Sequence, residues 1–168
     1  MMPRRFTHVI ATMVFASVTS ACHHPPRIDP SPVTADSVRG IVSITGTDFD
    51  QHIVIRSGNA VTPVAPNAAD SGALSRMGGV EVLVVGTRSG GQFRVDHFTA
   101  LSVDGSPVVD GLLRDGGNGL KLETTNGIIS LGNPPAALRN LIGARVWIGG
   151  PLDTGPNSYG VISPPKAR

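Results

Sequence analysis

Cysteine is nearly absent from this chain of 168 residues, which contains only Cys22. A single cysteine can form no intramolecular disulfide and cannot supply the several thiolates of a structural zinc site. Aromatic residues are also scarce, at 4% of the chain, whereas apolar residues reach 40%. The chain can therefore build a hydrophobic core, but that core has to be mainly aliphatic.

A hydrophobic run long enough to span a membrane is missing near the N-terminus. The apolar stretch there covers residues 6–18, whereas a helix needs about 20 apolar residues to cross a bilayer. The stretch follows Arg4 and Arg5 and precedes Thr19, Ser20 and Ala21. A basic start, a short apolar segment and small residues are typical of a secretory signal peptide, which we assign to residues 1–21.

The residue after this segment is Cys22. Thr19-Ser20-Ala21-Cys22 resembles the lipobox of bacterial lipoproteins, although that motif prefers leucine where Thr19 stands. The resemblance implies cleavage before Cys22 and acylation of Cys22, which would anchor the protein in a membrane of the cell envelope. Plain cleavage after Ala21, giving a soluble periplasmic protein, is the alternative.

Residues 22–36 follow as a Pro-rich tether that we expect to be disordered. His23 stands where inner-membrane lipoproteins of many enterobacteria carry aspartate. In an organism with two membranes, the resemblance therefore implies the outer membrane, on its periplasmic side.

An excess of positive charge is missing once the signal peptide is removed. Without Arg4 and Arg5 the 14 basic residues fall to 12, which equals the 12 acidic residues. Proteins that bind nucleic acids depend largely on basic residues that neutralise phosphates. Nucleic acid is therefore not an expected partner.

Glycine and proline are plentiful, with 21 and 14 residues, and they separate short apolar segments, a pattern typical of β-strands. The segments form two similar units, in which four blocks recur in the same order. The matching blocks are 38–42 with 109–113, 53–56 with 120–123, 74–86 with 138–150, and 93–95 with 159–161.

Each unit is predicted to contain three strands, a short helix and two further strands. In the first unit these are 38–45, 52–56, 60–64, the helix 71–77, 80–87 and 92–101. In the second they are 109–114, 119–123, 127–131, the helix 135–141, 144–150 and 158–163.

This order resembles the OB-fold, a five-stranded Greek-key barrel with its helix between the third and fourth strands. The predicted fold is therefore all-β: two small five-stranded OB-like barrels in tandem, each with one short helix, over residues 37–104 and 107–164. Another small β-barrel, such as an SH3-like one, is the structural alternative.

Candidate catalytic and metal-binding residues are few. The histidines show no zinc-site spacing, and the glycines at 116, 117 and 119 join two strands instead of preceding a phosphate-binding helix. No serine lies in a Gly-x-Ser-x-Gly motif. We therefore expect no metal, no cofactor and no enzymatic activity.

Leu83 and Trp147 occupy equivalent positions in the fourth strands of the two units. Valines and isoleucine alternate with them, and successive side chains of a strand point to opposite faces. If the alternating set fills each barrel, Leu83 and Trp147 point outward and form a candidate interface. Three roles stay open: packing between the units, binding of an external partner, or, for Trp147, completion of its own core.

The expected function is that of a non-enzymatic envelope lipoprotein that binds another protein or a cell-wall component. The alternative is a module for a small ligand or saccharide, with its site between the two barrels.

Overall fold

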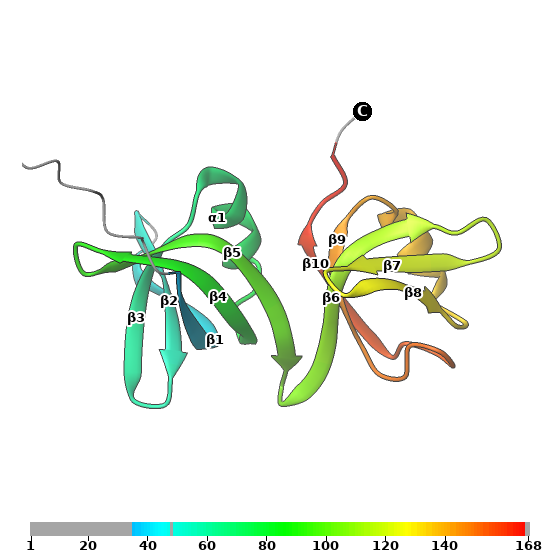
Figure 1. Ribbon diagram of the computed structural model, residues 1–168, viewed down its shortest axis with the longest axis horizontal. Helices are drawn as coiled ribbons and strands as arrows, with labels where there is room; N and C mark the ends of the chain where they lie inside the picture. Colours follow the sequence, from blue (N-terminus) through cyan, green and yellow to red (C-terminus); the bar gives the residue numbers. More distant parts are fainter. Residues whose placement is uncertain (1–34, 48, 167–168) are drawn as a thin grey trace, which may run out of the picture. The chain divides into compact units, whose positions relative to one another are not determined.

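The computed structural model describes residues 35–47 and 49–166 (Figure 1). The predicted signal peptide, the lipidation site Cys22 and nearly all of the tether lie outside these residues. All the described residues belong to one compact unit. None of the helices in this part of the chain is long and apolar enough to cross a membrane.

The first five strands form a closed barrel. Its pairs run β1–β2, β2–β3, β3–β5, β5–β4 and β4–β1, so the fifth pair returns to the first strand. Helix α1 lies between β3 and β4 in the chain, as the sequence predicts. The elements are β1 (Asp36–Thr47), β2 (Asp50–Ser57), β3 (Ala60–Ala65), α1 (Ala68–Ser75), β4 (Val80–Ser89) and β5 (Gln92–Val103).

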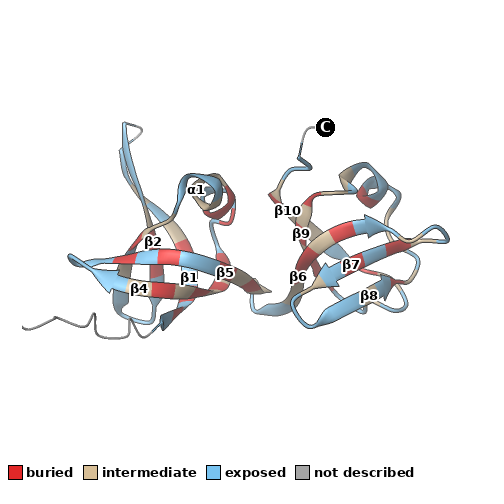
Figure 2. Ribbon diagram, turned by 45° about the horizontal axis from the view of Figure 1, so that its top comes forward, coloured by how far each residue is buried: buried red, intermediate tan, exposed pale blue. Residues whose placement is uncertain are grey.

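The interior of the barrel is filled by alternate residues of its strands. In β4, Val80, Val82 and Val84 are buried, and the residues between them are half-buried (Figure 2). Phe93 and Phe98 of β5 are also buried in this core. The predicted alternation, with the valines facing inward and Leu83 outward, is therefore confirmed for β4.

The remaining five strands repeat the same order of pairing, β8–β7–β6–β9–β10. A short 3-10 helix lies between the third and fourth of them. A second cluster of buried aliphatic side chains, including Leu113, Leu122 and Val146, fills this part. The elements are β6 (Ser106–Asp115), β7 (Leu120–Thr124), β8 (Gly127–Leu131), η1 (Ala136–Leu141), β9 (Arg145–Gly149) and β10 (Ser158–Ser163).

Closure distinguishes the two parts. In the first, two residue pairs join β3 to β5, whereas no pairing is found between β8 and β10 in the described part of the chain. Instead, the N–H of Gly132 donates to the carbonyl of Leu152, at 2.8 Å, in the loop 150–157. That loop joins β9 to β10, whereas only Gly90 and Gly91 join β4 to β5. The prediction of closed barrels is thus confirmed for the first part alone.

A tight turn links the two parts. β5 and β6 pair as a hairpin through Val103 and Ser106, and the two residues between them have positive φ, 47° at Asp104 and 76° at Gly105. Positive φ at both central positions is typical of the two-residue turns that fit the twist of a hairpin, and Asp-Gly is a favoured sequence there. β6 therefore starts directly beside the end of β5.

Candidate binding groove around Arg145

An ion pair links the neighbouring strands β6 and β9 on their outer face. Nε of Arg145 donates to Oδ1 of Asp110 at 2.8 Å, and Nη2 donates to Oδ2 at 2.6 Å. The side chain of Asp110 is 2% exposed and that of Arg145 is 29% exposed. The pair is thus bidentate and largely removed from water, a geometry in which charge-assisted hydrogen bonds are strong.

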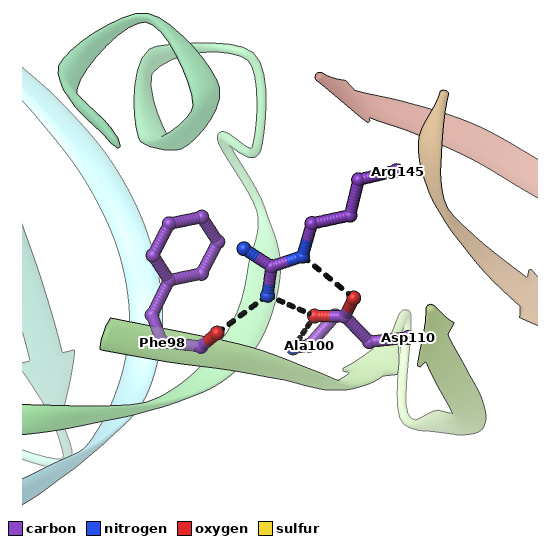
Figure 3. Close-up of polar contacts among 4 residues, drawn as sticks. All are labelled: Phe98, Ala100, Asp110 and Arg145. Atoms are coloured by element: carbon purple, nitrogen blue, oxygen red, sulfur yellow. Dashed lines mark hydrogen bonds and ion pairs between the residues drawn. The ribbon is translucent and has the colours of Figure 1, made fainter. Parts of the chain in front are cut away.

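The same pair holds strand β5 of the first barrel (Figure 3). The backbone N–H of Ala100 donates to Oδ2 of Asp110 at 3.0 Å, and Nη2 of Arg145 donates to the carbonyl of Phe98 at 2.5 Å. The guanidinium carbon also lies 4.5 Å from the centre of the Phe98 ring, within cation–π range. Three strands from both parts of the fold therefore meet at these two side chains.

An equivalent ion pair in the first barrel has its charges exchanged. The repeat aligns Arg39 with Asp110 and Glu81 with Arg145. Nε of Arg39 donates to Oε1 of Glu81 at 2.9 Å, but the Arg39 side chain is 65% exposed. The Arg39 guanidinium, followed by the Ser102 hydroxyl, holds the pKa of Glu81 below its usual range through hydrogen bonds. Both pairs therefore contact β5, but the second is the more deeply buried, with the Asp110 side chain 2% exposed against 27% for Glu81.

The larger of two hollows beside Arg145 has a volume of about 950 Å³. Helix α1, strand β6, the start of β9 and the segment after β10 surround it. Its walls combine apolar and charged side chains. The lining includes Asp70, Leu112, Arg114, Ile142, Arg145 and Lys166.

The smaller hollow has a volume of about 540 Å³ and is lined by β5, β6 and β7. Its lining includes Thr99, Thr124 and Thr125. Leu112 and Arg145 line both hollows. The two hollows therefore adjoin at these two residues, on the outer face of β6 and β9, and we refer to them together as the groove.

The charges of the groove are partly paired. Nε of Arg114 donates to Oε2 of Glu123 at 2.8 Å, which links the two hollows. Nδ2 of Asn67 donates to Oδ2 of Asp70 at 2.7 Å, at the start of α1. Lys166 has no acidic partner among residues 35–47 and 49–166. The larger hollow consequently carries more positive than negative charge.

Trp147 lies two residues after Arg145, so the alternation of β9 places it on the same outer face. It is half-buried and packs against the cluster of buried residues formed mainly by β1–β5. A Cβ at Gly160, its cross-strand partner in β10, would collide with the indole ring. Only glycine therefore leaves room for this position of the ring.

Leu83 occupies the equivalent place in β4, between Arg39 and Thr99 of the neighbouring strands. It is half-buried but belongs to neither cluster of buried residues. The structure thus gives the two candidates different surroundings, and a shared binding surface stays a prediction. In the described part of the chain, no three His, Cys, Asp or Glu residues are grouped so as to hold a metal ion.

Asp110, Leu112 and Arg145 are residues of the groove that the sequence reasoning did not select. The sequence did contain a signal for Asp110, because it is a charged residue within a predicted strand and the repeat aligns it with a residue of opposite charge, Arg39. On the neighbouring strand the repeat likewise aligns Arg145 with a residue of opposite charge, Glu81. Taken together, these two exchanges indicate an ion pair at the same place in both units, with opposite polarity.

Comparisons with protein-family models, with curated proteins and with solved structures found no match.

Proposed function

We propose that the protein is a cell-envelope lipoprotein anchored through Cys22, and that its β-structure is a non-enzymatic binding module. The ligand is a cell-wall component or a segment of another envelope protein. The observation that carries this proposal is the groove over Leu112 and Arg145, with hollows of about 950 and 540 Å³. Concave sites of this size, mainly apolar with a few placed polar groups, are typical of ligand binding.

The chemistry of the buried pair favours binding over catalysis. The Asp110 carboxylate accepts three hydrogen bonds, two from Arg145 and one from Ala100. A general base needs a lone pair within reach of the proton that it removes, and this carboxylate is committed to its donors. Its role in the proposal is to fix the groove, because it holds β5, β6 and β9 together.

The proposal includes OB-like architecture for both parts of the fold. In the second part, a contact with the loop 150–157 takes the place of the strand pairing that closes the first barrel. In OB-folds, ligands bind to the face of the second and third strands and to the loops beside it. The groove reaches that face only at β7 and otherwise lies on β6 and β9. Fold does not determine function, so the location of the site rests on its own lining and not on the fold.

A small ligand or saccharide is the second candidate, and the smaller hollow favours it. Thr99, Thr125 and Glu123 line it, together with Thr124, whose hydroxyl donates to the carbonyl of Gly127. Hydroxyl and carboxylate groups are suited to hydrogen bonding with sugar hydroxyls. Under this proposal the ligand would be short enough to lie within the groove.

The proposal is tested by retention of the full chain on purified peptidoglycan and by pull-down from solubilised envelopes. Ile142→Glu places a charge in the larger hollow, where Ile142 is 39% exposed. Ile44→Glu is the matched control, because Ile44 is 42% exposed on β1 and lines neither hollow.

Loss of retention, or of a specific envelope partner, in Ile142→Glu but not in Ile44→Glu is the expected result. Thermal stabilisation by an oligosaccharide, without retention or a partner, would favour the second candidate. Equal behaviour of the two variants in every assay would contradict a site in the groove.

A further inference from the structure

We infer that the larger hollow selects a ligand with a carboxylate attached to an apolar group, such as the free C-terminus of a peptide. The inference rests on the proposed function, because it specifies the chemistry of the ligand in the same groove. It follows from the charged residues that line the hollow, from the Arg145 nitrogen that has no acceptor among the described residues, and from the apolar walls.

The lining of the hollow contains three basic residues, Arg114, Arg145 and Lys166, and one acidic residue, Asp70. The hydrogen bond from Asn67 holds the Asp70 carboxylate at the start of α1. Glu123 and Asp110, the acidic partners of Arg114 and Arg145, are not part of this lining. An anion in the hollow would therefore meet two guanidinium groups that are already paired, the ammonium group of Lys166, and the carboxylate of Asp70.

Arg145 supplies a hydrogen-bond donor to the groove as well as charge. Its Nε and Nη2 are used by Asp110 and Phe98, but Nη1 has no acceptor among the described residues. In Figure 3 this nitrogen lies beside the Phe98 ring, on the side of the guanidinium away from Asp110. The pair thus holds in place a charged nitrogen from which a carboxylate can accept a hydrogen bond, and such bonds are among the stronger ones in proteins.

Lys166 adds a second cation from the segment that follows β10. Its ammonium group offers three donors to a carboxylate oxygen. Arg114 completes the set from β6, with its Nε already directed to Glu123. Two of the three cations are thus oriented by partners inside the fold, and the third is free of an acidic partner in the described residues.

The apolar walls decide between a carboxylate and a free inorganic anion. Leu112, Ile142 and Pro165 line the same hollow as the cations. Phosphate has no apolar part and would leave these side chains in contact with water. A carboxylate on a branched apolar group gains burial of apolar area in addition to the charged hydrogen bonds.

The test measures binding of matched probes to the full chain in detergent by equilibrium dialysis. The probes are radiolabelled N-acetyl-leucine and its amide, which differ in charge but hardly in size, and inorganic phosphate. We expect the acid to bind at least about ten-fold more tightly than the amide, as for a charge-assisted hydrogen bond. Phosphate should bind more weakly than the acid.

Lys166→Gln should remove most of the preference for the acid. Lys121→Gln is the matched control, because it makes the same change in net charge on β7, outside the lining of the hollow. This control should keep the preference.

Equal binding of acid and amide, tighter binding of phosphate, or no binding of the acid at millimolar concentration would overturn the inference. So would an equal effect of the two lysine variants. Retention on peptidoglycan that is sensitive to Ile142→Glu would leave the proposed function standing in each of these cases. Loss of the proposed function is thus distinguishable from loss of carboxylate selectivity.

Discussion

Asp110 and Arg145 form a buried bidentate ion pair whose two hydrogen bonds are 2.8 and 2.6 Å long. The equivalent pair of the first barrel, Arg39 and Glu81, has the opposite polarity and lies on an exposed face. The repeat thus preserves an ion pair at one place on the sheet. Contact with Phe98 and Ala100 of β5 turns the second pair into a junction between the two parts of the fold.

Replacement of Asp110 by asparagine should destabilise the protein by about 3 kcal/mol, because it leaves the Arg145 charge without its partner in a largely buried place. Denaturant unfolding of the full chain measures this loss. Glu81→Gln at the exposed equivalent pair is the control and should change stability little, since exposed ion pairs contribute weakly. Equal losses in the two variants would contradict the difference in burial.

Trp147→Ala should lower the free energy of unfolding by about 2 kcal/mol, less than for a fully buried aromatic side chain because the indole is half-exposed. The indole packs against the cluster of buried residues formed mainly by β1–β5 and fills the space beside Gly160. Its removal takes away this packing and leaves the space empty. Leu83→Ala, at the equivalent place but outside both clusters, should cost about 1 kcal/mol or less. Denaturant unfolding compares the two variants, and a larger effect of Leu83→Ala would show that the assignment of the two roles is reversed.

Gly132→Ala should cost about 2 kcal/mol, because a Cβ there would collide with the carbonyl of Asp153 and displace the loop 150–157. The loop would then lose the hydrogen bond that it accepts from Gly132 at the carbonyl of Leu152. Gly119→Ala is the control, since no atom lies near its added Cβ, and it should change stability by about 0.5 kcal/mol or less. Thermal unfolding compares the two, and similar midpoints would argue against a stabilising role of this loop contact.

Stability should fall in acid through Glu81 and Asp36. Hydrogen bonds from Arg39 and Ser102 lower the pKa of Glu81, and a hydrogen bond from Arg88, followed by one from the N–H of Ser37, lowers that of Asp36. A carboxylate with a lower pKa in the folded state contributes stability above its unfolded pKa, about 4.3 for glutamate and 3.9 for aspartate. This contribution is lost as the pH falls through the folded pKa.

Glu81→Gln should therefore reduce the slope of stability against pH below about pH 4.3 and leave the slope at neutral pH unchanged. Urea unfolding of the full chain at several pH values between about pH 2 and pH 6 gives the slope of stability in acid. The same measurement at several pH values around neutrality gives the slope there. A variant whose stability falls as steeply as that of the parent protein in acid would rule out a contribution from Glu81.

Cys22→Ser should abolish attachment of lipid and the cleavage that depends on it, because the thiol is the group that is acylated. Metabolic labelling with a fatty-acid analogue measures the attachment directly. Ser20→Ala is a matched control, since it keeps a small residue before the cysteine and should still be labelled. An unlabelled parent protein in the soluble periplasmic fraction would show plain secretion instead.

Much of the local structure could be predicted from the sequence. The alternation of valines around Leu83 indicated the buried face of β4, and the turn residues separated the ten strands at nearly their observed bounds. The order of strands and helix in the repeat indicated the pairing within the first barrel. These features depend on residues close together in the chain, where periodicity and turn chemistry act directly.

The groove could not be predicted in the same way. Asp110 and Arg145 are 35 residues apart, and Phe98 lies on a third strand. A charged residue in a strand is ordinarily expected on the exposed face, as Arg39 is. Only the packing of β5 against this face removes Asp110 from water, so its burial depends on the placement of both parts of the fold.

The sequence by itself determined the ten strands, the buried face of β4 and the repetition of one order of elements, because each is specified by side-chain periodicity and turn residues along short segments. Only the tertiary structure decided which unit closes as a barrel, which of two equivalent ion pairs is buried, and where the hollows lie. The physical reason is that these outcomes depend on competition between distant partners. The Gly132 N–H bonds to the loop at Leu152, and Asp110 binds groups from two other strands.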